Sequence, residues 1–236
     1  MIRKLVSGVI ALGVASPLLA QVFAPQRSKP PHTERMDFAP GGTIRIEDSN
    51  GDVYVEGWDQ PEVEVTILKS MPYGYKPKQP EEATKHLEGV RIVSERKSLT
   101  ELTIATTVAG NRRKTTEGVM IEYEIHVPRD SKLVIHHGVG SVFVLGMTSD
   151  IEVAGRRGDI QLMLSDRRAY SIDATTRLGT VMSDFDGTTN LRRYRLGERY
   201  TTASAPASPQ IRLRMGIGGI AIKAVPPEAY STEIVK

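Results

Sequence analysis

The chain has 236 residues, of which 25% are charged and 39% are apolar, an ordinary composition for a folded protein. Aromatic residues make up only 6%, so the sequence does not favour an aromatic-rich groove for sugars. The absence of cysteine excludes disulfides, a thiol nucleophile, zinc sites built on thiolates and a lipidated N-terminal cysteine.

Residues 1–20 have the features of a secretory signal peptide. Arg3 and Lys4 provide the positive start, an apolar run follows from Leu5 to Ala15, and Ala20 is the expected last residue before cleavage. An uncleaved anchor is the alternative, but the run is shorter than the ~20 residues that a membrane-spanning helix needs. We therefore expect an exported protein, periplasmic or on the cell surface, without a stable membrane span after cleavage.

Removal of residues 1–20 would leave a nearly neutral chain with 29 basic and 28 acidic residues. Residues 21–150 contain 16 basic and 19 acidic residues, whereas residues 151–236 contain 13 and 9. This balance and an exported destination do not favour a nucleic-acid partner. An electrostatic partner is expected to prefer the C-terminal half.

Residues 21–38 are rich in Pro, Lys, Ser and Gln and are expected to be a linker. Residues 39–130 are expected to form an N-terminal β region, in which Asn50-Gly51 is a tight-turn signal. A short helix is predicted over residues 80–89, because Pro80, Glu81 and Glu82 favour a helix start and Gly89 favours its end.

Residues 131–225 are expected to form regular rungs, because a short motif repeats in them. It begins with glycine and occurs as Gly140-Ser141-Val142, Gly158-Asp159-Ile160 and Gly179-Thr180-Val181, at steps of 18 and 21 residues. A fourth copy, Gly218-Gly219-Ile220, follows 39 residues later. Such spacing predicts an all-β fold, a right-handed β-helix or β-solenoid-like stack of short strands with glycines at the corners.

Apolar and polar residues alternate within each copy, so one face of each strand should be buried. The residues expected to point inward are Val142, Val144, Ile151, Val153, Ile160, Leu162, Leu164, Ile172, Ala174, Ile211, Leu213, Met215, Ile220 and Ile222. The residues expected to point outward are Ser141, Glu152, Asp159, Gln161, Asp173, Thr180, Arg212 and Arg214. A basic hairpin or loop over residues 190–210 interrupts the rungs, and residues 226–236 are expected to be a tail.

Several stretches together resemble a known family. They are GGTIRIEDSNGDVYVEGWDQPEVEVT, then YEIHVPRDSKLVIHHGVGSVFVLG, and then GDIQL, GTV and GGIAI. They are similar to the bacterial putative-adhesin family of unknown function, relatives of auto-transporter adhesin head domains, over about Phe38 to Ala224. The resemblance implies a β-helix or β-solenoid outside the cytoplasm and brings no catalytic residues with it.

Four arginines are the candidate ligand-binding residues. Because equivalent turns of stacked rungs lie about 4.8 Å apart, Arg156, Arg157, Arg167 and Arg168 are interpreted as one edge that faces an anionic polymer or lipid head groups. The alternative is a solvated edge whose charge is offset by nearby aspartates, and it is the more favoured of the two.

Other polar residues have structural explanations that outweigh functional ones. His136 and His137 are adjacent on an expected strand, so their side chains should point to opposite faces and should not converge on a metal. Asp184 and Asp186 have the spacing of a calcium or glycosidase pair, but Asp186-Gly187 is also a common turn. No catalytic residue, metal site or cofactor is therefore expected.

The sequence thus predicts a non-catalytic, adhesin-like binding or structural module of the cell envelope. Its expected partner is an anionic polysaccharide or an envelope protein, and its oligomeric state is left open. One alternative is a small carbohydrate-active β-helix enzyme that acts on acidic polysaccharide. Another is an accessory protein of envelope stress or signalling, which would contact a membrane partner through the insertions at residues 70–89 and 190–210.

Overall fold

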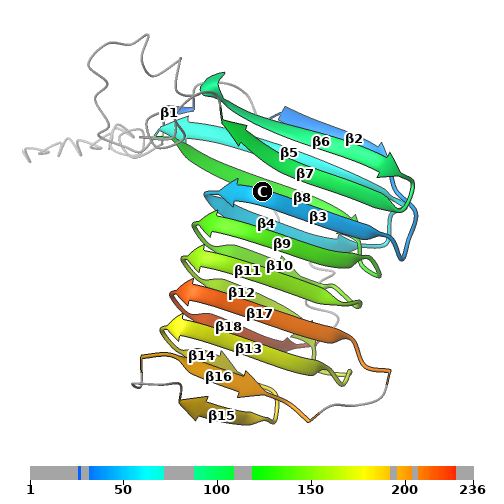
Figure 1. The fold of residues 1–236 in the computed structure, drawn as a ribbon. Coiled ribbons are helices and arrows are strands. Elements are labelled where there is room, and N and C mark those ends of the chain that lie inside the picture. Colours follow the sequence, from blue (N-terminus) through cyan, green and yellow to red (C-terminus); the bar gives the residue numbers. More distant parts are fainter. Residues whose placement is uncertain are drawn as a thin grey trace, which may run out of the picture.

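The protein is all-β, with two sheets that face each other across one hydrophobic core (Figure 1). The computed structural model describes residues 26–27, 32–71, 88–108, 119–191, 196–203 and 207–226, which form eighteen strands in two nine-stranded sheets. Within these residues there is no helix long and apolar enough to cross a membrane.

The first sheet, here called sheet A, is parallel in its middle and antiparallel at one end. Its strands, in order across the sheet, are β1 (Gln26–Arg27), β5 (Glu62–Met71), β8 (Met120–Pro128), β4 (Asp52–Trp58), β10 (Val142–Leu145), β12 (Ile160–Ser165), β18 (Ile220–Val225) and β14 (Val181–Ser183). The ninth strand, β2 (His32–Asp37), pairs antiparallel with β5.

The second sheet, sheet B, carries the strand that precedes each central strand of sheet A. Its order is β15 (Thr188–Leu191), β16 (Glu198–Thr201), β13 (Ser171–Leu178), β17 (Gln210–Ile217), β11 (Ile151–Arg157), β9 (Lys132–Val139), β3 (Thr43–Asn50), β7 (Glu101–Val108) and β6 (Val90–Ser98). The hairpins β6–β7 and β15–β16 lie at opposite ends of this sheet.

Five pairs of consecutive strands form the regular part of the fold. Each pair, here called a rung, consists of a strand of sheet B and the next strand of sheet A: β3–β4, β9–β10, β11–β12, β13–β14 and β17–β18. Neighbouring rungs pair in parallel, with Val142, Ile160 and Ile220 level with one another. All the residues predicted to point inward belong to the core, which confirms the predicted orientation of the rungs.

The rungs do not stack in the order of the sequence. Rung β17–β18, the last in the chain, lies between β11–β12 and β13–β14 and pairs in parallel with both (Figure 1). The 39-residue step before the fourth repeat therefore does not place that repeat after the third. The chain passes over one rung position, forms β13–β14 and the hairpin β15–β16, and then returns to fill that position.

A column of glycines forms one corner of every rung. In spatial order it consists of Gly51, Gly140, Gly158, Gly218 and Gly179, all with φ between +106° and +139°. The amides of the first four donate to the carbonyl that precedes the corner of the next rung, as Gly140 does to Arg157 and Gly158 to Ile217. A Cβ on Gly158 would overlap the carbonyl oxygen of Gly140. The predicted glycine corners are therefore required by both φ and space.

The structure differs from the predicted boundaries near the N-terminus. His32–Asp37, inside the expected linker of residues 21–38, is strand β2, because its backbone completes the edge of β5. The predicted regions 39–130 and 131–225 share both sheets, since β3 pairs with β9 and β4 with β10. Of the short helix predicted over residues 80–89, only Glu88 and Gly89 are among the described residues, and both are helical; the rest of the stretch lies outside them. The predicted signal peptide, and the predicted tail after Pro226, also lie outside the described residues.

Substitution of the column glycines should destabilise the fold more than substitution of another glycine with positive φ. Gly41 has φ of +75°, but a Cβ there would meet nothing within 4 Å. We expect Gly41→Ala to cost about 1–2 kcal/mol from backbone strain alone. Gly158→Ala should cost several kcal/mol more, because its Cβ also collides with backbone. Urea denaturation measures both, and equal losses would show that the close approach has no energetic importance.

The inward face of a rung should not tolerate charge, whereas its outward neighbour should. Ile160 is fully buried, so Ile160→Asp should lower the free energy of unfolding by more than about 3 kcal/mol or prevent folding. Asp159 is exposed, and its Oδ1 accepts from the Gly219 amide over 2.7 Å. An amide oxygen can replace that acceptor, so Asp159→Asn should change stability by less than about 0.5 kcal/mol. Similar denaturation midpoints for both variants would contradict the assignment of faces.

Candidate binding surfaces

The four arginines predicted to line one edge lie at two different edges. Arg156 and Arg157 end β11, beside the glycine corner at Gly158, whereas Arg167 and Arg168 follow β12 at its far end. Arg168 donates to the carbonyl of Thr148 over 3.0 Å, in the turn before β11. All four residues are exposed. The four arginines do not form one edge, because β11 ends at the edge with the glycine corner and β12 ends at the opposite edge. Their binding of anions stays a prediction.

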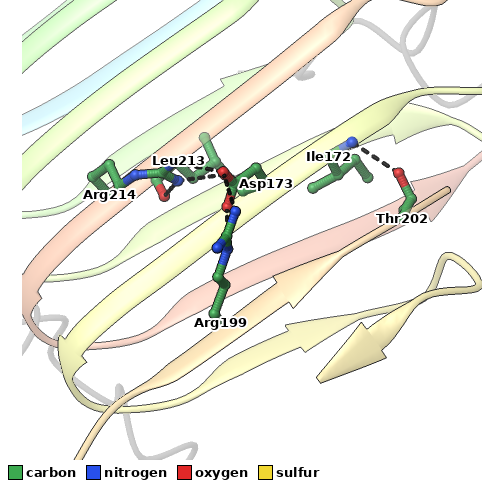
Figure 2. Close-up of polar contacts among 6 residues, drawn as sticks. All are labelled: Ile172, Asp173, Arg199, Thr202, Leu213 and Arg214. Carbon is green, nitrogen blue, oxygen red and sulfur yellow. Dashed lines mark hydrogen bonds and ion pairs between the residues drawn. The ribbon is translucent and has the colours of Figure 1, made fainter. Parts of the chain in front are cut away.

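The outer face of sheet B carries a cluster of charged residues from three neighbouring strands. Asp173 of β13 accepts from Arg214 of β17 over 2.7 Å and from Arg199 of β16 over 3.1 Å (Figure 2). Arg214 also donates to the Asp173 carbonyl over 2.7 Å. We call these three residues the Asp173 cluster. It joins the returning rung and the terminal hairpin to β13.

The carboxylate of Asp173 is held in its charged form by the two arginines. Partial burial acts to raise the pKa of Asp173, but the hydrogen bonds and charges of Arg214 and Arg199 outweigh it, so the pKa lies below the usual value of 3.8. Two guanidinium groups share one carboxylate, so the cluster keeps a positive charge. It therefore adds a cationic patch to the outer face of sheet B.

A shallow depression of about 470 Å³ lies on sheet B near the glycine corner. It is bordered by His136, His137 and Arg156, and it is hollow because Ala154 and Gly155 are level with the two histidines. His136 is exposed and contacts Glu47 over 2.8 Å, whereas His137 is buried, which confirms that the two side chains point to opposite faces. Burial lowers the pKa of His137, although nearby backbone carbonyls and Asp52 act in the opposite direction.

Of the two paired aspartates, Asp184 is accounted for by local structure. Asp184 accepts from the Ala224 amide over 3.3 Å and lies 3.7 Å from Lys223, so it fastens the chain after β14 to β18. Within the described part of the chain, no group of three or more His, Asp or Glu side chains is arranged to hold a metal ion.

The outer face of sheet A carries a different surface. Tyr54 of β4 and Phe143 of β10 are level in the sheet, and their rings stack with centroids 4.7 Å apart and planes 4° from parallel. Leu145 and Met163 continue the apolar area on β10 and β12, since they are neighbours in register and only partly buried.

Carboxylates surround one side of this aromatic pair. Asp52 and Glu56 lie on β4, and Glu122 and Glu124 lie level with Asp52 and Tyr54 on β8. Burial of the phenol and the charges of Asp52, Glu122 and Glu124 raise the pKa of Tyr54, so its hydroxyl stays a donor at neutral pH. We call Tyr54, Phe143 and these four carboxylates the acidic aromatic face.

Sequence reasoning missed this face, although a signal for it was present. Tyr54 and Phe143 are 89 residues apart, but each is the third residue after a column glycine, Gly51 or Gly140. Alignment of the two repeats at those glycines places the aromatic rings in one row. The net charge of residues 21–150 pointed to an acidic N-terminal half without locating its charges on one surface.

Comparisons with known proteins identify similar folds but no family. No family model matches the chain, and no curated protein matches it in sequence. A putative cell adhesion protein from Clostridium sporogenes is similar in structure, with a TM-score of 0.50 and 12% identity, over 83% of this chain and 100% of that one. A putative adhesin from Bacteroides fragilis matches with a TM-score of 0.30 and 8% identity, over 84% of this chain and 99% of that one. The first likeness supports the all-β fold alone.

The Asp173 cluster should make stability depend on pH at the acid end. Because the folded pKa of Asp173 is depressed, its contribution is complete above the unfolded value of 3.8 and is lost as pH falls through the lower folded pKa. We expect Asp173→Asn to lower the free energy of unfolding by about 1 kcal/mol at pH 7. The difference from the unsubstituted protein should shrink as pH falls below 3.8.

Glu152→Gln is the matched control, because Glu152 is on the same outer face but outside the cluster. Urea denaturation at several pH values distinguishes the two variants. A loss for Asp173→Asn that is equal at all pH values would mean that the ion pairs do not stabilise the fold.

Proposed function

We propose that this protein is an exported, non-catalytic and adhesin-like binding module of the cell envelope, built as a right-handed β-solenoid. The proposal is supported by the signal-like residues 1–20, by the five parallel rungs and by the similarity of the fold to the putative cell adhesion protein. Stacked rungs display long rows of side chains on flat outer faces, which suits contact with an extended partner.

The acidic aromatic face is the observation that carries the choice of partner. Four carboxylates lie beside an aromatic pair, and Tyr54 is 42% exposed. Carboxylates attract lysine and arginine, while the aromatic rings and the neighbouring Leu145 and Met163 can cover apolar side chains. We therefore propose that the partner is an envelope protein that presents basic and apolar side chains to sheet A.

An anionic polysaccharide on the arginine edges is the second candidate partner. It is favoured by the exposure of Arg156, Arg157, Arg167 and Arg168 and by the excess positive charge of residues 151–236. Their division between two edges offers such a polymer two smaller contact sites in place of one continuous edge.

Binding to isolated envelope fractions tests the function and separates the two partners. Residues 21–236 should bind saturably at low salt and more weakly at high salt, because both candidate contacts are electrostatic. Glu122→Gln with Glu124→Gln should weaken binding about threefold to tenfold, as expected for the loss of two exposed ion pairs. Protease treatment of the fraction should abolish the binding.

The double variant Arg167→Ala with Arg168→Ala tests the second candidate partner, the anionic polysaccharide, in the same assay. It should leave binding unchanged if the partner is a protein on the acidic aromatic face. Protease-resistant binding that depends on the arginines would replace the protein by an anionic polymer. The absence of saturable binding to every fraction would contradict a binding function.

A further inference from the structure

The inserted rung β17–β18 occupies a position that the rest of the chain leaves open between two formed rungs. β11 and β13 do not pair with each other, because β17 lies between them, and β18 lies in the same way between β12 and β14. The five residues between Ser165 and Ser171 advance along the stack by two strand spacings, about 9.6 Å, which an extended chain of that length can span. The earlier strands thus leave a gap one rung wide between β11–β12 and β13–β14, which we call the slot.

The slot recognises the backbone of the inserted rung as well as its side chains. Oδ1 of Asp150 accepts from the Gln210 amide over 2.8 Å, Oδ1 of Asp159 accepts from the Gly219 amide over 2.7 Å, and Asp184 accepts from the Ala224 amide. All three acceptors belong to the slot, and all three donors belong to β17–β18 or the residue before β18. Ile211, Leu213, Met215, Ile220 and Ile222 of the inserted rung are buried in the core.

An empty slot would be unstable and would tend to pair with another strand. Loss of β17–β18 would expose four strand edges with unpaired backbone groups, together with apolar core, and such edges pair readily with another strand. The inserted rung is joined to the remaining described strands only through the residues between Thr201 and Gln210, because no described strand follows Val225. Within the described residues, its release would therefore break no connection to another strand.

We propose that this slot is a strand-acceptor site that can bind either its own β17–β18 or the β17–β18 of a second copy. Two copies then associate by exchanging this rung. The second copy is the fitting occupant because its segment carries the same buried side chains and the same amides that the three aspartates accept. Exchange of an identical element is a route to dimers that needs no new contact surface.

Introduced cysteines can detect the exchange, because the native chain has none. Glu152 of β11 and Arg212 of β17 are register neighbours on the outer face. Neighbouring strands are about 4.8 Å apart, which is within the range of Cα separations that a disulfide bridges. Glu152→Cys and Arg212→Cys in one chain should give an intramolecular disulfide in the monomer.

The test mixes two full chains, one with Glu152→Cys alone and one with Arg212→Cys alone. The mixture is partly unfolded in urea, refolded and oxidised under mild conditions. Exchange predicts a mixed disulfide between the two chains in excess of random pairing, because position 152 of one copy then lies beside position 212 of the other. Mass spectrometry of the linked peptides measures it.

Glu47→Cys and His136→Cys provide the matched control pair. These residues are also in contact across two strands of sheet B, over 2.8 Å, but β3 and β9 lie in the uninterrupted part of the stack. Their two single variants should give only random pairing. The proposal is overturned if the mixed disulfide of the first pair does not exceed random pairing, or if the control pair exceeds it to the same extent.

Discussion

The parallel backbone ladder that passes through the glycine column is the constraint on which the rest of the structure depends. Each column glycine turns the chain from sheet B to sheet A with a positive φ, and the amides of Gly51, Gly140, Gly158 and Gly218 bond along the stack to the carbonyl before the next corner. This contact is possible only because no Cβ separates the two backbones. It fixes the spacing of the rungs and aligns their side chains, so the core and both outer faces follow from it.

Alignment at one corner explains why distant residues meet on the surface. Tyr54 lies beside Phe143, and Glu47 lies beside His136, although both pairs are 89 residues apart in the chain. A position counted from a column glycine specifies a row on the sheet, and the rung specifies a place in that row. Tyr54 and Phe143 are neighbours in one such row on sheet A. The Asp173 cluster lies on the opposite side of the core and joins residues at different positions of β13, β16 and β17.

The fold was predictable from sequence wherever a local pattern determines it. Every residue that alternation assigned to the inward face of a rung belongs to the core, and repeated glycines identified the corners, because both depend on period and on φ. The order of the rungs was not predictable, since the pairing of β17 with both β11 and β13 is a choice between distant partners of similar pattern. Strand β2 was missed because its pairing with β5, and not its own composition, makes it a strand.

The candidate site was less accessible to sequence reasoning than the fold. Arg156 and Arg167 were assigned to one edge because both were taken to lie in equivalent, stacked turns. The turn after β11 and the turn after β12 instead lie at opposite edges of the sheets. Conversely, Asp173 and Arg214 are 41 residues apart and meet because the returning rung brings β17 next to β13. In this fold, charged residues that are close in sequence can lie at different edges, and charged residues that are far apart in sequence can form one cluster.

The inserted rung comes last in sequence among the described strands, which also affects when folding can finish. Because a chain is synthesised from its N-terminus, β11–β14 are complete before β17–β18 has been made. Until then β11–β12 and β13–β14 share no strand pair, so the continuous core cannot form. Completion of the fold therefore waits for β17–β18, and a chain that stops before β17 would remain open in the middle, with the strands on both sides of the gap already made.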